Sequence, residues 1–225
     1  MDTTESLPAI GIYGGTFDPI HYGHLRMAEE LADIIGLQRV IFLPSGSPRL
    51  RAAPAAARMA RSEMVRLAIQ GNDRFTVDER EINRPGISTT IESLREFRAE
   101  LGSRVALCFI IGADAFLKID QWHEWRALFH VCHFVIVSRP GYAPVDDRFI
   151  CSGDIESEWT QRRIFSADDL KLQPAGYIFT PRTSRLEISA SQIRDLAGNG
   201  KSPRYLLPEV VADYIRLNSL YIEKA

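Results

Sequence analysis

The chain has 225 residues, of which 45% are hydrophobic and 25% are charged, a balance typical of a globular protein and not of a largely disordered one. Its formal net charge of −2 argues against a nonspecific nucleic-acid binder, because such proteins need a broad basic surface. The three cysteines form no Cys-x-x-Cys pair, and the apolar runs are too short to cross a bilayer. We therefore expect a cytoplasmic protein that binds neither nucleic acid nor membrane.

Short apolar runs alternate with amphipathic segments along the chain. The runs predict five strands: Ala9–Tyr13, Val40–Leu43, Val105–Ile111, His133–Ser138 and Tyr177–Phe179. The segments with helical spacing are Leu25–Ile35, Met59–Ile69, Thr90–Leu101 and Trp122–Phe129. Fully apolar strands that alternate with helices are typical of a parallel sheet covered on both faces. The pattern predicts a doubly wound (Rossmann-like) α/β fold with a mainly parallel sheet.

Two segments outside this alternation define the expected domain organisation. Arg139–Gly176 is long and polar and predicts irregular structure. The tail Ser189–Leu220 has helical spacing, interrupted at Gly198–Pro208. We expect one α/β domain over residues 1–187 and a small helical C-terminal appendage over residues 188–225, packed on the same domain.

The strongest functional signal follows the first predicted strand, where Gly14–Leu25 reads Gly-Gly-Thr-Phe-Asp-Pro-Ile-His-Tyr-Gly-His-Leu. Glycines after a strand let a phosphate approach the backbone, and the start of the next helix attracts anions. His21 and His24 share one helix face and can donate hydrogen bonds to phosphate oxygens. A zinc site is the weaker alternative, because this helix carries no third ligand.

A second motif lies at Ile188–Arg194, which reads Ile-Ser-Ala-Ser-Gln-Ile-Arg. A serine that opens a helix, with an arginine five residues later, places hydroxyls, N–H groups and a guanidinium around one anion. Taken alone, the segment is better explained as a serine N-cap followed by a solvated arginine. The neighbourhood favours the anion, since it is rich in cations: Arg182, Arg185, Arg194, Lys201 and Arg204. Two phosphate cradles in one chain indicate a triphosphate ligand.

Both motifs carry a resemblance to a known family. Gly14–Leu25 resembles the G-G-T-F-D-P-x-H-x-G-H-L signature of the nucleotidyltransferase superfamily, and Ile188–Arg194 resembles its I-S-x-[ST]-x-I-R signature. More narrowly, the chain is similar to bacterial nicotinate-nucleotide adenylyltransferases over nearly its whole length. The supporting segments are Leu43-Pro44, Asp78–Glu81, Phe109–Asp114, Trp122, Arg139–Tyr142 and Leu206–Pro208.

The resemblance implies that AMP passes from ATP to nicotinate mononucleotide, giving deamido-NAD and pyrophosphate. It implies Mg²⁺ carried by ATP, with no metal site on the protein. The residues implied in catalysis are His21, His24 and Arg194. Those implied in ATP binding are Gly14, Gly15, Thr16, Phe17, Ser189 and Ser191. Those implied in mononucleotide binding are Arg49, Thr89, Gly112, Asp114, Trp122 and Arg139, with the indole on the pyridine ring and Asp114 at the ribose.

The chain departs from the family pattern in two places. The loop after the second predicted strand lacks the usual histidine but carries Arg49, Arg51, Arg58 and Arg61, with no acid from residue 45 to residue 62. Arginine can replace such a phosphate contact, although a solvated basic loop explains the pattern equally well. Thr89 stands where the family commonly has tyrosine, so the detailed make-up of the nicotinate pocket does not follow from the resemblance.

Several alternatives remain at this stage. Related enzymes act on nicotinamide mononucleotide or phosphopantetheine, or transfer CMP, and a nucleotide-binding regulator without activity would keep the same fold. A dinucleotide-dependent oxidoreductase is disfavoured, because no Gly-x-Gly-x-x-Gly follows the first strand. The expected partners are ATP and nicotinate mononucleotide, and the chain is either a monomer or a homodimer.

Overall fold

The computed structural model describes residues 6–46, 53–138 and 153–222. Within these ranges, seven strands form one sheet in the order β3-β2-β1-β4-β5-β7-β6, and every pairing is parallel. The strands are β1 (Ala9–Gly15), β2 (Leu37–Pro44), β3 (Phe75–Val77), β4 (Ala106–Gly112), β5 (His133–Val137), β6 (Arg163–Ile164) and β7 (Ile178–Phe179). The predicted α/β class and parallel sheet are confirmed.

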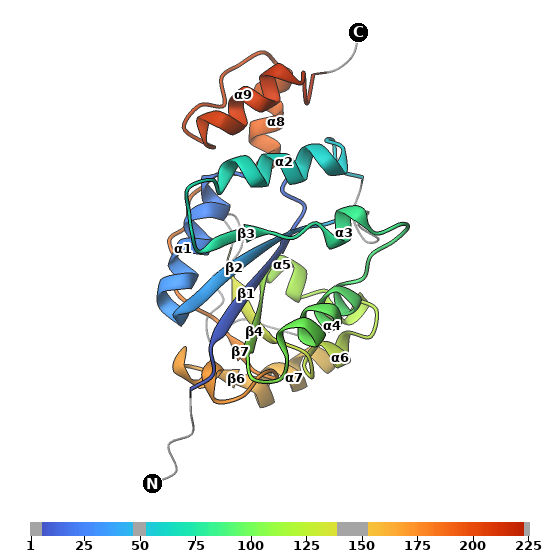
Figure 1. Cartoon of the computed structure of the whole chain (residues 1–225), viewed down its shortest axis with the longest axis vertical. Helices are drawn as coiled ribbons and strands as arrows, with labels where there is room; N and C mark the ends of the chain where they lie inside the picture. The colour runs from blue at the N-terminus through green and yellow to red at the C-terminus, as the bar shows by residue number, and fades with distance from the viewer. Residues whose placement is uncertain (1–5, 47–52, 139–152, 223–225) are drawn as a thin grey trace.

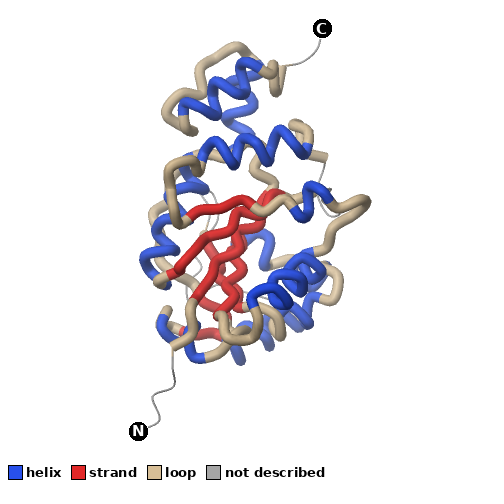
Figure 2. Tube along the Cα trace, in the orientation of Figure 1, coloured by secondary structure: helices blue, strands red, loops and turns tan. Residues whose placement is uncertain are grey.

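Helices cover both faces of the sheet (Figures 1 and 2). One face packs against α1 (Tyr22–Ile35) and α2 (Arg58–Ala68), and α8 (Ala190–Gly198) and α9 (Glu209–Leu217) extend the same hydrophobic core beyond α2. The other packs against α4 (Thr90–Leu101), α5 (Ala113–Phe116), α6 (Trp125–Leu128) and α7 (Asp154–Arg162). The remaining turns are α3 (Arg80–Asn83), η1 (Ile119–Gln121) and η2 (Asp168–Leu172). This double covering explains why the central strands are apolar along their whole length.

The apolar spacing of the sequence accounts for the main elements. Every residue of β4 is buried, as expected for a central strand covered from both sides. In α1, the buried residues from Met27 to Ile35 recur every three or four positions and face the sheet. The helix ends where Gly36 adopts a left-handed conformation with φ of 71°, which glycine accepts without strain.

The chain reverses direction across the sheet between β1 and β4. From β1 it moves outward through β2 to β3, and it then returns to place β4 on the other side of β1. Such a reversal opens a crevice beyond the carboxyl ends of the two central strands, which is where open α/β sheets bind ligands. Gly15 and Gly112 end these two strands, so the fold places the end of the first motif's strand and the predicted mononucleotide-binding Gly112 at this edge of the sheet.

Some elements differ from the sequence-based expectation. The predicted helix Trp122–Phe129 begins only at Trp125, because Glu124 adopts a left-handed conformation with φ of 49°. The prediction of irregular structure for Arg139–Gly176 is wrong for its described part, which contains α7, β6 and η2. The helix α7 buries only Ile155 and Trp159, and two apolar residues are too few to reveal a helical stripe in a polar segment.

The predicted C-terminal helices are confirmed, with their break after Gly198. Ile193 of α8 and Val211 and Ile215 of α9 join the same hydrophobic core as α1 and α2, and α9 lies against α2 (Figure 1). A domain boundary at residue 187 stays a prediction. None of the helices in the described part of the chain combines the length and hydrophobicity that a bilayer-spanning segment needs.

Candidate active site

The first motif forms the turn between β1 and α1, with the two histidines at the start of the helix. His21 is the N-cap of α1, in an extended conformation with φ of −151°, and its carbonyl accepts a hydrogen bond from the His24 N–H at 2.9 Å. The two imidazole rings lie almost face to face, with centroids 3.8 Å apart and planes inclined by 32°. The prediction that they share one helix face is confirmed.

Aromatic packing fixes the turn in front of these histidines. Phe17 is buried, and its ring meets His24 edge to face, with centroids 5.2 Å apart. A Cβ on Gly15 would stand 2.7 Å from the Phe17 ring, and a Cβ on Gly14 would stand 3.0 Å from the Phe109 ring. A side chain at Gly15 would force the Phe17 ring to shift, and one at Gly14 would press tightly on the Phe109 ring. The predicted contact of both glycines with phosphate stays a prediction.

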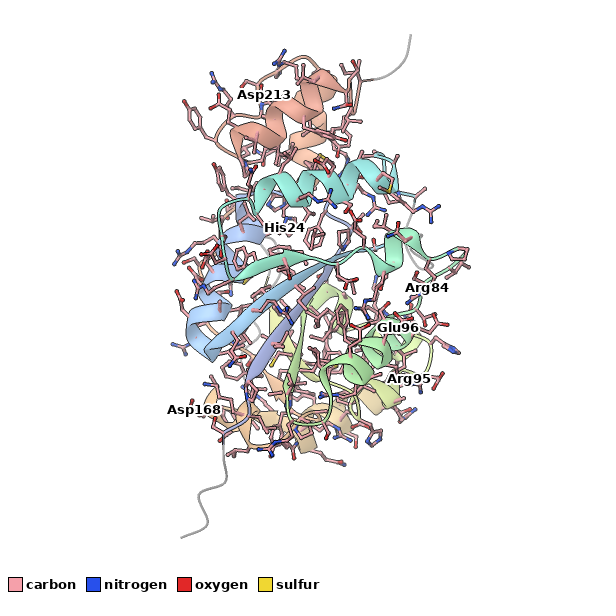
Figure 3. All side chains as sticks on the ribbon, viewed as in Figure 1. His24, Arg84, Arg95, Glu96, Asp168 and Asp213 are labelled. Atoms are coloured by element: carbon pink, nitrogen blue, oxygen red, sulfur yellow. The ribbon has the colours of Figure 1, made fainter. Side chains whose placement is uncertain are left out.

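A cleft of about 850 Å³ opens over this turn, a volume within the usual range for ligand sites. Eight predicted site residues line it: Gly15, Thr16, Phe17, His21, His24, Asp114, Ser189 and Arg194. Five others do not, namely Gly14, Thr89, Gly112, Trp122 and Ser191. Figure 3 shows His24 just below α2, whereas Arg84 and Glu96 lie toward the right-hand side of the view, near α3 and α4. The cleft thus gathers the three predicted catalytic residues and most of the predicted ATP-binding residues from distant parts of the chain.

The second motif forms the start of α8 and closes one wall of the cleft. Ser189 is the N-cap, and its hydroxyl accepts the Gln192 N–H at 3.2 Å and lies 3.1 Å from the Ser191 hydroxyl. The Arg194 guanidinium donates to the backbone carbonyl of Asp18 at 2.7 Å. The two motifs, far apart in the sequence, are therefore joined directly, and Arg194 is anchored in the first motif.

The carboxyl end of β4 supplies the opposite wall. Gly112 ends the strand, and Asp114 lies in the first turn of α5 and lines the cleft. Trp122 follows η1 and is half-buried, with its ring edge-on to Phe109 at a centroid distance of 6.3 Å. Its neighbour Trp125 is buried in the core. Trp122 therefore keeps part of its indole exposed, which a stacking surface needs.

Thr89 lies outside the cleft, at the start of α4. Its N–H and its hydroxyl both donate to the Glu92 carboxylate, at 3.0 and 2.7 Å, as part of a capping box at the start of the helix. A nucleotide group that accepts a hydrogen bond from the Thr89 N–H or hydroxyl must compete with Glu92 for it. Arg49 and Arg139, also predicted for the mononucleotide, lie outside the described residues.

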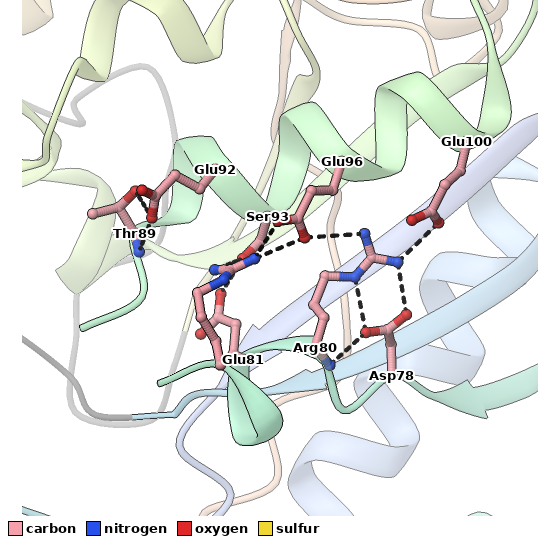
Figure 4. Close-up of polar contacts among 9 residues, drawn as sticks. Asp78, Arg80, Glu81, Thr89, Glu92, Ser93, Glu96 and Glu100 are labelled. Atoms are coloured by element: carbon pink, nitrogen blue, oxygen red, sulfur yellow. Dashed lines mark hydrogen bonds and ion pairs between the residues drawn. The ribbon is translucent and has the colours of Figure 1, made fainter. Parts of the chain in front are cut away.

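A polar network holds the start of α4 against α3 (Figure 4). Arg84 donates to the Ser93 hydroxyl at 3.1 Å and to both carboxylate oxygens of Glu96, and Ser93 donates to Glu81 at 2.8 Å. Glu81 is buried, and burial raises its pKa, although its hydrogen bond from Ser93 opposes the rise. Arg80 pairs with Asp78 beside this network. These contacts fix the α4 N-terminus relative to the sheet.

Arg61 has a different role from the one its sequence suggested. It is fully buried instead of forming part of a solvated basic loop. Its guanidinium donates to the backbone carbonyls of Thr16, Ser45 and Gly46, at 2.7, 2.6 and 3.0 Å. Burial lowers its pKa, and the nearby Asp18 carboxylate opposes the change. Arg61 therefore links the loops after β1 and β2, and its guanidinium is hydrogen-bonded to the protein's own backbone carbonyls.

Asp18 is the main residue of the site that sequence reasoning left without a role. Its buried carboxylate accepts hydrogen bonds from the N–H groups of Ala55 and Ala56, at 2.7 and 3.1 Å, and from the Tyr221 hydroxyl at 2.8 Å. The only available signal was its place inside the first motif. Its partners lie 37 to 203 residues away, and no local pattern reveals them.

No group of three or more histidine, cysteine, aspartate or glutamate side chains suited to a metal ion occurs among the described residues. The cleft is lined by the carboxyl-bearing residues Asp18, Asp114 and Glu187, besides its imidazoles, hydroxyls and guanidinium groups. Asp18 is already engaged by the three donors described above.

Comparison with known proteins agrees with this geometry. A family model described as cytidylyltransferase-like matches residues 12–196. A protein of Dechloromonas aromatica described as "Probable nicotinate-nucleotide adenylyltransferase" is 44% identical over 212 residues, which cover 94% of this chain and 97% of the relative. The chain belongs to the nicotinate-nucleotide adenylyltransferase family. A relative with the same description in Serratia proteamaculans is 44% identical over 93% of this chain and 94% of its own.

Solved structures of the family share the fold. Plasmodium falciparum nicotinic acid mononucleotide adenylyltransferase complexed with NaAD has a TM-score of 0.69 and 19% identity, covering 95% of this chain and 97% of that one. Its complex with APC has a TM-score of 0.65 at 18% identity, with the same coverage. The predicted family, fold and enzyme class, a nucleotidyltransferase of the nicotinate-nucleotide adenylyltransferase family, are confirmed. The roles of individual residues stay predictions.

Proposed function

We propose that this chain transfers AMP from ATP to nicotinate mononucleotide, forming deamido-NAD and pyrophosphate. The observation that carries the proposal is the joining of both motifs in one cleft, with His21, His24 and Arg194 directed to a common space. Two imidazoles, a guanidinium and the start of a helix favour a bound polyphosphate. The relatives' shared description supports the choice of reaction.

The proposed step is a direct in-line displacement. A phosphate oxygen of the mononucleotide attacks the α-phosphorus of ATP, a new P–O bond forms, and the bond from the α-phosphorus to the bridging oxygen breaks. The electron pair leaves with pyrophosphate. His21, His24 and Arg194 stabilise the negative charge that develops on the phosphate oxygens, so that positioning and electrostatics supply the acceleration. No covalent enzyme intermediate is required.

The mononucleotide is proposed to bind across β4, near Asp114 and Trp122. The Asp114 carboxylate can accept hydrogen bonds from ribose hydroxyls, and the half-buried indole of Trp122 can stack on a pyridine ring. Phe109 lies between this region and β1, since its ring meets both Trp122 and the Gly14 backbone. The two substrates would then meet at the carboxyl ends of β1 and β4.

Mg²⁺ is proposed to enter bound to ATP, where it neutralises phosphate charge. This arrangement needs no metal site on the protein, because Mg²⁺ takes its ligands mainly from substrate phosphates and water. We place the reaction in the cytoplasm, a compartment that suits the buried free thiols of Cys108 and Cys132.

The test is a pyrophosphate-release assay with ATP, Mg²⁺ and one of two acceptors, nicotinate mononucleotide or nicotinamide mononucleotide. We expect release with the nicotinate compound, and deamido-NAD as the product by mass spectrometry. Release with neither acceptor overturns the proposed function. Release with the amide alone keeps adenylyl transfer and overturns the acceptor.

A further inference from the structure

The C-terminal segment contacts the first motif through Tyr221, which is not among the residues that line the cleft. Tyr221 follows α9, and its hydroxyl donates to the Asp18 carboxylate at 2.8 Å. The segment is closely packed, since the Tyr221 carbonyl lies 2.9 Å from the place that a Cβ on Gly198 would occupy. Burial raises the pKa of Tyr221, and the Asp18 carboxylate raises it further, so the hydroxyl remains a donor at neutral pH.

Asp18 is held in one orientation by the donors around it. The N–H groups of Ala55 and Ala56 fix its carboxylate from one side, and Tyr221 completes the set. Hydrogen bonds to an ionised carboxylate are among the stronger ones in proteins. Removing the Tyr221 hydroxyl leaves one oxygen of a buried carboxylate with a weaker set of donors.

The backbone of Asp18 connects its fixed carboxylate to two residues that line the cleft, Arg194 and His21. Its carbonyl accepts the hydrogen bond from Arg194 at 2.7 Å, and the chain runs from it directly to His21. The earlier part of the same loop is fixed separately, because the buried Arg61 holds the Thr16 carbonyl at 2.7 Å. Tyr221 therefore acts on the half of the loop that places Arg194 and His21.

We propose that Tyr221 is a positioning residue for ATP: through Asp18 it holds Arg194 and His21 in the arrangement that binds the triphosphate. This inference rests on the proposed function. It gives the C-terminal segment a part in nucleotide binding without contact with either substrate.

The test is steady-state kinetics of Tyr221→Phe in the full chain, with Tyr205→Phe as the matched control, since Tyr205 lies in the same C-terminal part and is 87% exposed. We expect the KM for ATP to rise about tenfold in Tyr221→Phe, the scale of one charged hydrogen bond. We expect the KM for the mononucleotide to stay within about twofold, because that substrate binds across β4. Tyr205→Phe should match the wild type.

A merely structural role would give a different result. Loss of folded enzyme lowers the maximal rate and leaves both KM values unchanged, and a thermal melt of each variant measures that loss. An unchanged KM for ATP in Tyr221→Phe, with an active wild type, overturns the inference, whereas an inactive wild type overturns the proposed function instead.

Two further variants test the route of the effect. In an Arg194→Lys background, Tyr221→Phe should change the KM for ATP by less than about twofold, because both substitutions act through Asp18. A full tenfold change in that background would show that Tyr221 acts independently of Arg194. Asp18→Asn, which keeps the size of the side chain, should raise the KM for ATP even if Tyr221→Phe fails to fold, and an unchanged KM there also contradicts the proposal.

Discussion

His24 lies between the ring of His21 and the ring of Phe17, at the start of α1 and on the wall of the cleft. Its role as a donor to the transferring phosphate predicts that His24→Ala lowers kcat by about 100-fold or more, a typical loss for a group that stabilises the transition state. The measurement is steady-state pyrophosphate release, with circular dichroism to establish that the variant is folded.

His130→Ala is the matched control, because His130 is exposed and lies outside the cleft. Its kcat should equal that of the wild type. A folded His24→Ala variant with near-normal kcat would remove His24 from the mechanism and leave charge stabilisation to His21 and Arg194.

Trp122 gives a separate prediction for the second substrate. Trp122→Ala should raise the KM for nicotinate mononucleotide by about tenfold, in line with the cost of losing one stacked ring, and leave the KM for ATP within about twofold. Trp122→Phe retains an aromatic face and should restore most of the affinity. Equal effects on both KM values would point to a general disturbance of the Phe109 packing instead of stacking.

Some residues of the candidate site could be predicted from the sequence, and others could not. His21, His24 and Arg194 lie in compact motifs that resemble those of a known family, and the structure brings all three to one cleft, although their roles stay predictions. The contact of Asp18 with Tyr221 could not be predicted, since a hydrogen bond between residues 203 positions apart leaves no local pattern. The burial of Arg61 was hidden for the same reason, because a basic segment looks solvated until the carbonyls that surround it are known.

Among the helices, α8 combines a structural and a proposed binding role at its first turn. Ser189 caps the helix, whereas Ser191 lies within it and is exposed. Ser189→Ala should therefore lower the free energy of unfolding by about 1 kcal/mol, the usual cost of a lost N-cap, and Ser191→Ala should change it by less than about 0.5 kcal/mol. Urea denaturation measures both values, and equal losses would contradict the capping role.

Long, buried strands and helices were predicted from the sequence more readily than short ones. β1, β2, β4 and β5 were predicted because a buried parallel strand is apolar throughout. β3 and β6 were missed, since they contain three and two residues and each includes a polar one. The equally short β7 was predicted because both of its residues are apolar and buried. The four-residue helices α3 and α5 escaped prediction because so short a run has no detectable period.

The stability of the whole molecule depends on pH through His133, a buried histidine at the start of β5 that does not line the cleft. The Nε2 of His133 lies 2.9 Å from the Gln173 carbonyl, and its Nδ1 accepts the Tyr177 N–H at 3.0 Å. These partners require a neutral ring that carries its proton on Nε2. Burial lowers the pKa of His133 to about 4, from an ordinary value of 6.5.

This lowered pKa predicts a pH dependence of stability. Between pH 6.5 and about 4 the unfolded chain binds a proton at His133 that the folded chain does not, so the free energy of unfolding falls as the pH falls through this window. From about pH 7.5 to about pH 5 the loss due to His133 should be about 2 kcal/mol. Urea denaturation at both pH values measures it.

His133→Asn removes the titrating group. The free energy of unfolding of this variant should therefore fall by about 2 kcal/mol less than that of the wild type between about pH 7.5 and about pH 5. His130→Asn, at an exposed position, should show the wild-type dependence. The same fall in His133→Asn as in the wild type would assign the acid sensitivity to other groups.

The contact between Tyr221 and Asp18 also bears on how the protein is made. The walls of the cleft come from the beginning, the middle and the last quarter of the chain, and the hydrogen bond that holds Asp18 joins residues 203 positions apart. Synthesis proceeds from the N-terminus, and early segments fold first. A growing chain on the ribosome therefore carries both histidines long before Arg194 and Tyr221 emerge. The proposed ATP site is therefore incomplete until the residues up to Tyr221 have been synthesised.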